Sequence, residues 1–470
     1  MKRSFIRLGS CLLLASIMSA VTASAATYNV NSIADLQARI NSAVAGDIII
    51  MHNGVYTTSA AITVNRQGTA ADPIRIVAQT VGGVEITGAQ GFNITNPAAY
   101  IVIEGFLFTH VSGRIQIRSG ATHIQFTRNF FECTGEGAYL TIAGDDAQIN
   151  FNEFRNKSTL GNMIDVRGSG SQIARRVWIH HNYFHDFISP GGNGAETIRF
   201  GLSGLSLSNG FGLIEHNLFE RCTGENELIS NKSSSNTYRY NTIVDSPGGE
   251  LTLRHGNDCL VYGNYFRNSA GMRIFGDRHQ VFSNYFESTI GINIGNGDGE
   301  VADGAPLTSH DRPDDCVISF NTLVNSTRNY FMTGRTNGLG ATNIVFANNI
   351  IQGGGAAAGL SGTYPGGSWS GNIIWNILSA GDMPVGTYEM VNPLLVQKAN
   401  GVFRPQAGSP AIDSAVGDFP AVTFDLDGQP RTGPKDRGAD ENSAESVIAE
   451  LLTPGDILRL IHGQPSVDTH

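Results

Sequence analysis

Apolar and polar positions follow a short motif that recurs along most of the chain. In each copy, two or three alternating residues lead to an Asn, and a short stretch of bulky apolar residues follows. Clear copies occupy residues 126–131, 149–154, 179–184, 214–219, 238–243 and 261–266. The recurring residues are Asn129, Asn152, Asn182, Asn217, Asn241, Asn264, Asn284, Asn321, Asn348 and Asn372, spaced 20 to 37 residues apart.

This spacing is typical of a parallel β-helix, in which each coil has about three short strands and longer steps are loops inserted at one turn. Asn at a fixed turn tolerates left-handed backbone and can stack its amide on the coils above and below. A β-propeller or a sandwich does not explain one Asn recurring along the chain. The predicted fold is therefore all-β, a single-domain right-handed parallel β-helix over residues 26–440.

The two ends of the solenoid carry different signals. Ser32 stands three residues before Asp35, and Leu36, Ile40 and Val44 follow at helical spacing, which predicts a short capping helix. Residues 408–413 and 425–431 are rich in turns and are expected to close the last coils. Residues 441–470 are predicted to form short helical turns that cover the C-terminal end, or else a mobile tail.

The first residues predict export. Lys2, Arg3 and Arg7 precede a short apolar run and Ala23-Ser24-Ala25, a pattern that indicates a signal peptide over residues 1–25, with a buried N-terminal helix as the alternative. We therefore expect a periplasmic or secreted protein, a monomer, without a membrane span. Removing these three cations changes the formal charge from −10 to −13, which argues against nucleic acid as a partner.

Four cysteines remain after the predicted cleavage: Cys133, Cys222, Cys259 and Cys316. Cys259 and Cys316 each lie five residues before a recurring Asn, so they share a column two coils apart. Two coils correspond to about 9.6 Å at strand spacing, beyond the reach of a disulfide. We expect four buried free thiols.

Three polar stretches are expected to lie side by side on one face of the stack. Counted from the nearest recurring Asn, Glu227, Glu250, Arg273 and Asn293 are predicted to share one column. Lys232 has the wrong parity to join Glu227 on a straight strand, so a bend near Asn231 must bring it round. The predicted face collects Glu225, Glu227, Lys232, Arg254, His255, Arg273, Arg278 and His279.

These residues favour a functional site over an ordinary solvated surface. Apolar neighbours flank the charges, and half-buried charges need partners or a ligand. Two carboxylates and an amide oxygen suit calcium, whereas zinc prefers His or Cys. A lysine beside a divalent cation and arginines has its ammonium form disfavoured and can act as a general base. This set fits β-elimination on a uronic acid better than hydrolysis by paired carboxylates.

The chain resembles polysaccharide lyase family 6, which includes alginate lyases and chondroitinase B. The resemblance covers roughly residues 27–440 and is carried by three motifs: Asn193-Gly194-x-Glu196-x-Ile198-Arg199-x-Gly201, Glu225-x-Glu227-x-x-x-x-Lys232-Ser233 and Leu253-Arg254-His255-Gly256. It implies calcium on Asn193, Glu225 and Glu227, with Lys232 as base and Arg254 on the acid side.

Alginate is the expected substrate of this predicted lyase. Substrate contacts are expected from Arg199, His255, Arg273, Arg278 and His279. The alternatives are a lyase on a dermatan- or chondroitin-type glycosaminoglycan, a polysaccharide hydrolase, and a β-helix that binds glycans without cleaving them.

Overall fold

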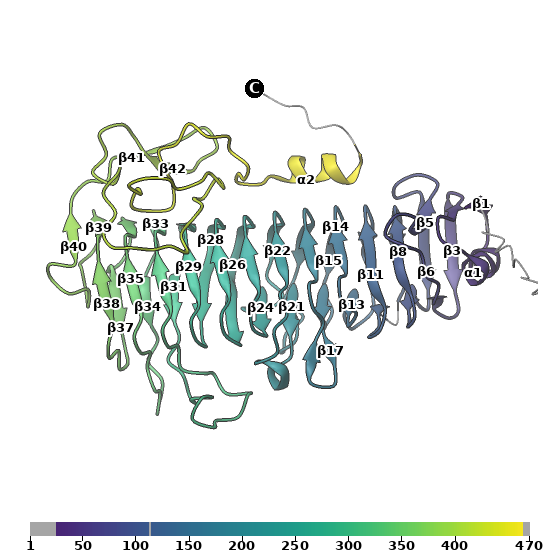
Figure 1. Ribbon diagram of the computed structural model, residues 1–470, viewed down its shortest axis with the longest axis horizontal. Coiled ribbons are helices and arrows are strands. Elements are labelled where there is room, and N and C mark those ends of the chain that lie inside the picture. Colours follow the sequence, from purple (N-terminus) through teal and green to yellow (C-terminus); the bar gives the residue numbers. More distant parts are fainter. Residues whose placement is uncertain (1–24, 112–113, 464–470) are drawn as a thin grey trace, which may run out of the picture.

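The computed structural model describes residues 25–111 and 114–463. The chain forms a long stack of coils whose strands make three parallel columns (Figure 1). The predicted parallel β-helix is therefore confirmed. The predicted signal peptide lies outside the described residues except for Ala25.

The first column is a 14-stranded sheet. Its strands are β1 (Thr27–Val30), β2 (Ile48–Met51), β5 (Ile74–Ala78), β8 (Ala99–Glu104), β11 (Thr122–Thr127), β14 (Gln148–Asn150), β19 (Trp178–His180), β22 (Leu213–Glu215), β25 (Thr237–Arg239), β27 (Leu260–Tyr262), β29 (Gln280–Phe282), β32 (Val317–Ser319), β35 (Val345–Ala347) and β38 (Ser368–Ser370).

The second and third columns form one 24-stranded sheet, because two long strands run through both. The second column holds β3 (Gly54–Thr58), β6 (Val84–Gly88), β9 (Phe106–Phe108), β12 (Phe130–Phe131), β15 (Glu153–Lys157), β20 (Tyr183–Phe187), β23 (Leu218–Cys222), β26 (Thr242–His255), β28 (Tyr265–Ile274), β30 (Tyr285–Glu287), β33 (Thr322–Val324), β36 (Ile350–Gln352), β39 (Asn372–Trp375) and β40 (Tyr388–Met390).

The third column carries the polar stretches singled out above. It holds β4 (Ile62–Val64), β7 (Phe92–Ile94), β10 (Ile115–Ile117), β13 (Leu140–Ile142), β16 (Ile164–Val166), β21 (Ile198–Gly201), β24 (Ile229–Lys232), the C-terminal parts of β26 and β28, β31 (Gly291–Ile294), β34 (Asn329–Met332) and β37 (Ala358–Leu360). Two short hairpins, β17 (Gly168–Ser169) with β18 (Gln172–Ile173) and β41 (Leu395–Gln397) with β42 (Phe403–Pro405), and a turn of 3-10 helix, η1 (Ser203–Leu205), lie outside the columns.

Stacking of like side chains explains why the repeat folds this way. Alternate strand residues point inward, and the ring of Phe154 lies 4.3 Å from that of Phe131 and 4.8 Å from that of Phe184. Phe184 in turn lies 4.8 Å from Phe219. Each of these rings follows its recurring Asn by two positions, so the apolar part of the motif builds a continuous core.

The recurring Asn residues form a buried ladder between the first and second columns. Asn217 donates from Nδ2 to Asn241 Oδ1 (3.0 Å) and to the carbonyl of Ile179 (2.9 Å), and the same Asn241 oxygen accepts from its backbone N–H (3.1 Å). One rung differs from the prediction, because Asn349 rather than Asn348 links Asn321 to Asn372. The left-handed backbone falls on the residue before each Asn, such as His216 before Asn217, rather than on the Asn itself.

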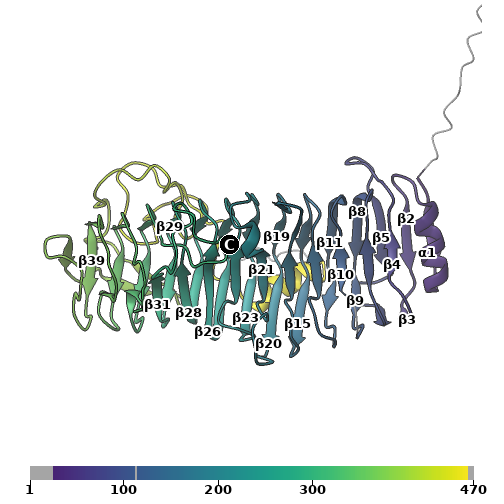
Figure 2. The same ribbon diagram turned by 90° about the horizontal axis from the view of Figure 1, so that it is seen from below.

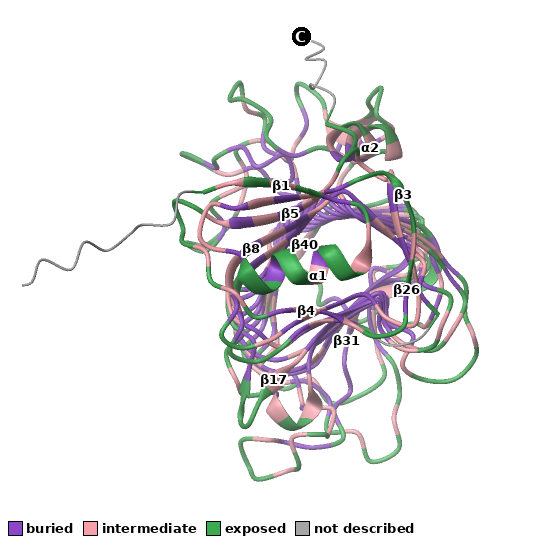
Figure 3. Ribbon diagram, turned by 90° about the vertical axis from the view of Figure 1, so that its right-hand side faces the viewer, coloured by how far each residue is buried: buried purple, intermediate pink, exposed green. Residues whose placement is uncertain are grey.

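The N-terminal cap is confirmed. Helix α1 (Ile33–Ser42) lies across the open end of the coils (Figure 3) and buries Leu36 and Ile40. The Ser32 side chain accepts from the N–H of Asp35 and starts the helix. Val44 lies beyond the helix end. The four cysteines of the described residues, Cys133, Cys222, Cys259 and Cys316, are buried free thiols, as expected.

The C-terminal segment is placed differently from the prediction. After β40 the chain turns back along the outer face of the second column, where Tyr265 donates to Asp427 (2.9 Å) and Arg431 reaches Ser283 (3.4 Å). Helix α2 (Pro454–Ile461) packs Ile457 and Ile461 on a patch of that face, far from the last coil (Figure 1). Residues 408–431 therefore cover the flank instead of closing the last coils, and residues 443–452 are not helical.

The described part of the chain has two α-helices, of 10 and 8 residues, and neither is long and apolar enough to cross a membrane.

Candidate active site

The candidate site lies along the third column, where β21, β24, β26, β28 and β31 lie side by side (Figure 2). Lys232 is the last residue of β24, and the ladder with β26 shifts by one residue between Asn231 and Lys232. The β-bulge lies in β26, where Arg254 has no partner in β24. β24 itself pairs with β21 residue by residue up to Lys232, so the bend predicted near Asn231 is not present there. The parity changes earlier, at Leu228 and Ile229, which are both buried in the core. The inward amide of Asn231 bonds the carbonyls of Ser233 (2.8 Å) and His255 (3.0 Å).

Three carboxylates converge beside the start of β24. One oxygen from each of Glu196, Glu225 and Glu227 lies within 4.8 Å of the others. Glu225 Oε2 accepts from the N–H groups of Gly194 (2.7 Å) and Ala195 (2.9 Å). Burial raises the pKa of the Glu225 carboxyl, and repulsion from Glu196 and Glu227 adds to the effect.

Glu227 is the one of the three carboxylates that also pairs with two arginines. Its Oε1 pairs with Arg273 (2.8 Å) and Arg254 (3.1 Å), and its Oε2 accepts from the hydroxyl of Ser230 (2.5 Å). The side chain is 11% exposed. The same oxygen atom thus holds both guanidinium groups at the edge of the site.

Glu196 belongs to the site, although no role was predicted for it from the motif Asn193-Gly194-x-Glu196. It accepts from Lys232 Nζ at Oε1 (3.1 Å) and from Asn162 Nδ2 at Oε2 (2.7 Å), with only 2% of its side chain exposed. Burial alone would raise its carboxyl pKa, but the charges of Lys232 and Arg199 outweigh burial and lower it. Its position three residues after the predicted metal ligand Asn193 could have indicated that it belongs to the site.

The predicted column of Glu227, Glu250, Arg273 and Asn293 is wrong for its first two members. Arg273 pairs in register with Thr252 on one side and Asn293 on the other, while Glu250 pairs with Gly271 and Glu227 precedes β24. The charges still meet, because the long Arg273 side chain reaches Glu227 and also Glu250 (3.0 Å).

Arg254 Nη1 and Asn293 Oδ1 on this face are buried without a hydrogen-bond partner, and the buried Arg273 Nε has only its ion pair with Glu250. A cavity of about 200 Å³ adjoins Asn293 and is lined by Arg273, Phe275, Asn293, Gly295, Asn296, Thr333, Gly334 and Arg335. Guanidinium groups beside a cavity suit an acidic ligand.

His255 is buried directly after Arg254. Burial and the charges of Arg254 and Lys232 lower the pKa of its imidazole to about 3. Its ring also lies 6.4 Å from the ring of His310, in the loop after β31. A neutral imidazole with this pKa is a weak proton acceptor.

The remaining predicted site residues are more scattered. Arg199 pairs in register with Ser230 and is tied to Asp165 (2.9 Å). Asn193 is exposed, next to the Gly194 N–H that binds Glu225. Arg278 is half exposed and pairs with Asp258 (2.8 Å).

His279 is fully buried, and its two ring nitrogens bind the carbonyl of Phe275 (2.9 Å) and the N–H of Cys259 (3.1 Å). The structure therefore does not bring Arg278 and His279 into the candidate site.

The donor set fits a hard divalent cation. Carboxylate oxygens are the ligands that calcium prefers, and three of them converge here. Burial raises the pKa of Glu225 and the charges of Glu196 and Glu227 add to this, so its carboxylate form would be stabilised by a cation beside it.

Comparison with known proteins gives one family. The model of the chondroitinase B family matches residues 30–350. No match was found among curated protein sequences.

Solved structures agree with this family. The PL6 family alginate lyase AlyGC superposes with a TM-score of 0.74 at 25% identity, over 81% of this chain and 55% of that one. The chain thus spans about half the length of AlyGC. A mannuronic acid specific family 6 lyase from human gut microbiota gives a TM-score of 0.68 at 25% identity, over 78% of this chain and 91% of that one. A PL6 alginate lyase solved with a trisaccharide shares the fold, with a TM-score of 0.67, 20% identity, and 82% and 91% coverage.

The match over more than half of the chain, together with these structures, establishes the family. The chain belongs to the chondroitinase B family, that is, polysaccharide lyase family 6.

Proposed function

We propose that the protein is a calcium-dependent polysaccharide lyase that cleaves alginate by β-elimination at the C4–O bond. The observation that carries this proposal is the group of three carboxylates on one strand face, with the Lys232 amine paired to Glu196 and two arginines paired to Glu227. Alginate is the favoured substrate because the similar family 6 structures are described as alginate lyases.

Glu225 and Glu227 are the proposed cation ligands, with Asn193 from the neighbouring loop, and Glu196 lies close enough to join them. Bound calcium would neutralise the uronate carboxylate and make the C5 proton more acidic. Glu225 is already fixed by two backbone N–H groups, so its free oxygen is held in place for this role.

Lys232 is the proposed base. In its neutral form its amine takes the C5 proton, the electron pair of that C–H bond forms the C4–C5 double bond as the C4–O bond breaks, and the leaving glycosidic oxygen takes a proton from the side of Arg254. The ammonium group produced lies 3.1 Å from Glu196, whose carboxylate stabilises the new positive charge. Asn162 holds Glu196 from the other side.

Arg254 is proposed to act on the leaving side. Its Nε is fixed by Glu227, while Nη1 has no partner and is free to bind a sugar or glycosidic oxygen. Arg273 and Arg199 are proposed to contact substrate carboxylates. His255 is proposed to line the site without taking the proton, because its lowered pKa makes it a weak base.

A dermatan-type glycosaminoglycan is the second candidate substrate, because the matched family model is that of chondroitinase B. Hydrolysis is less favoured, since each carboxylate of the site is engaged by lysine, arginine or backbone donors. We further propose that the chain acts as an exported monomer, in the periplasm or outside the cell.

The test follows two signals of cleavage in one assay, the ultraviolet absorbance of an unsaturated uronide and the number of new reducing ends. The purified protein is incubated with mannuronate blocks, guluronate blocks or dermatan sulfate in the presence of calcium. β-Elimination on alginate should raise the ultraviolet absorbance of an unsaturated uronide in step with new reducing ends. New reducing ends without absorbance would identify a hydrolase, and no cleavage of any polymer would identify a binding protein.

A further inference from the structure

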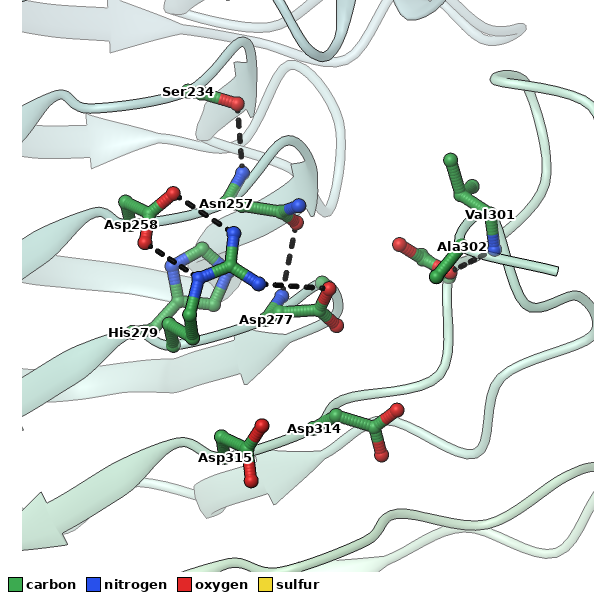
Figure 4. Close-up of polar contacts among 12 residues, drawn as sticks. Ser234, Asn257, Asp258, Asp277, His279, Val301, Ala302, Asp314 and Asp315 are labelled. Atoms are coloured by element: carbon green, nitrogen blue, oxygen red, sulfur yellow. Dashed lines mark hydrogen bonds and ion pairs between the residues drawn. The ribbon is translucent and has the colours of Figure 1, made fainter. Parts of the chain in front are cut away.

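A second group of acidic residues lies outside the candidate active site, under the loop between β31 and β32. Asp277 follows β28, and Glu300, Asp311 and Asp314 come from the loop. This loop projects below the strands in Figure 1, and Figure 4 shows Asp277 and Asp314 facing the segment that carries Val301 and Ala302.

Backbone hydrogen bonds fix the loop on both sides of Asp277. The N–H of Gly276 donates to the carbonyl of Asp311 (3.3 Å), and the N–H of Arg278 donates to that of Asp314 (2.8 Å). Because Asp277 lies between these two anchor points, the main-chain bonds hold the loop segment of Asp311 and Asp314 beside it.

One oxygen at the centre of this group has no protein partner. Asp277 Oδ1 is buried without a hydrogen bond, and the Asp277 side chain is 10% exposed. Its other oxygen makes only a long contact with Arg278 (3.4 Å), which is bound mainly to Asp258. Asp311 has one oxygen on the N–H of Val301 (2.7 Å).

Charge within the group is not balanced. Arg312 pairs with Glu300 and Asp314 (2.9 Å each), which leaves Asp277 and Asp311 without a full countercharge of their own. Burial and the neighbouring aspartates raise the pKa of the Asp277 carboxyl to about 7, and burial also raises that of Asp311. Buried carboxylates of this kind need a proton or a cation.

We propose that Asp277, Asp311 and Asp314 bind a second calcium ion, separate from the one proposed at Glu225 and Glu227. All the side-chain donors are oxygens, and both ring nitrogens of nearby His279 are already used. The oxygens lie further apart than the 4.8 Å that encloses those of Glu196, Glu225 and Glu227, so binding would draw the loop toward Asp277.

The glycine-rich start of the same loop is a different feature. The sequence Asn296-Gly297-Asp298 suggests a weak calcium-loop pattern, but Asn296 Oδ1 accepts from Gly340 (2.9 Å) and Asp298 binds His310 (3.1 Å) and Arg335 (3.2 Å). These contacts place Asp298 and His310 beside His255 and Arg254. A cation at Asp277 would therefore anchor the loop that forms one side of the candidate active site.

The experiment measures calcium binding directly, on the full chain after removal of all metal. Calcium alone is titrated by calorimetry into the Glu225→Gln variant and into a Glu225→Gln/Asp277→Asn double variant. We expect the single variant to bind one equivalent that the double variant has lost. Calcium should also raise the Tm of the single variant and leave that of the double variant unchanged.

Two further variants complete the design. Asp311→Asn in the same background should lose the same equivalent, which keeps the test valid if Asp277→Asn folds poorly. Asp315→Asn is the matched control, because this neighbouring aspartate is exposed and bonds Asn343 (3.1 Å) instead. It should bind calcium like its parent.

The outcomes separate this proposal from the proposed function. Calcium that binds the wild type but not Glu225→Gln overturns the second site and leaves the first intact. Equal binding by the single and double variants also overturns it. Calcium that still binds Glu225→Gln and is lost with Asp277→Asn supports the second site even if the protein proves not to be a lyase.

Discussion

Two rows of polar side chains run along the same solenoid and have different roles, one in stability and one in ligand binding. In the Asn ladder, each amide is buried and bonded to the coils before and after it, as Asn217 is to Ile179 and Asn241. On the strand face of Lys232 and Arg254, charges are crowded and Arg254 Nη1 and Asn293 Oδ1 have no partner. A row whose polar groups all have hydrogen-bond partners stabilises the fold. A row whose buried polar groups lack partners can bind a ligand that supplies them.

The largest effect should come from disturbing the carboxylates of the strand face. Glu225→Gln, or exhaustive metal removal, should lower kcat/KM on alginate by at least about 10³-fold, because the uronate charge is then no longer neutralised. The circular dichroism spectrum should not change, and calcium should restore activity to the stripped wild type. Full activity in excess chelator after metal removal would contradict this.

Arg254→Lys should have a smaller effect on the same face. The lysine keeps the charge but loses the fork that binds Glu227 and a substrate oxygen together, so kcat should fall about 10- to 100-fold. Steady-state kinetics on alginate oligosaccharides measure this. Wild-type kcat in this variant would mean that the unpartnered Nη1 has no role in the reaction.

Asn217→Ala should lower the free energy of unfolding and leave turnover unchanged. Removing one amide leaves buried donors and acceptors unpaired in both neighbouring coils, at a cost of about 2–4 kcal/mol in the free energy of unfolding. Turnover measured well below the Tm should stay near that of the wild type.

The control for the ladder variant is Asn41→Ala, an exposed position on α1, which should change stability by less than about 0.5 kcal/mol. Denaturant unfolding compares the two variants. Equal stability of Asn217→Ala and Asn41→Ala would show that the ladder contributes little.

The smallest effect should come from Arg278→Ala. Arg278 lies on the same coil as Arg273, but it is bound to Asp258 at an exposed turn instead of facing Glu227. We expect kcat/KM within about twofold of wild type for Arg278→Ala and a clear loss for Arg273→Ala. A matching loss in both variants would mean that the site extends to the turn of Arg278.

The sequence predicted the ladder, the capping helix and the free thiols, because each depends on local periodicity. The change of parity that Lys232 requires was correctly expected but misplaced, because it falls at the buried pair Leu228 and Ile229 and not near Asn231. The rung at Asn348 was misplaced by one residue, because Asn349 beside it satisfies the same motif.

Other features depend on turn lengths and tertiary packing that periodicity does not encode. Counting from the ladder put Glu227 and Glu250 in the row of Arg273, but each turn before the strand has its own length, and the register differs. Glu196 and Lys232 meet only through the stacking of separate coils. His279 was expected on the exposed face and lies in the core, and the C-terminal segment covers a flank whose apolar residues belong to the coils.

The most direct test of the account is the turnover of Lys232→Arg, measured together with oligosaccharide binding and beside His255→Ala. Arginine keeps the positive charge but does not readily lose its proton. We predict that Lys232→Arg binds substrate and loses about three or more orders of magnitude in kcat, while His255→Ala keeps most of its turnover. Near-native turnover in Lys232→Arg with a large loss in His255→Ala would contradict the account and make His255 the base.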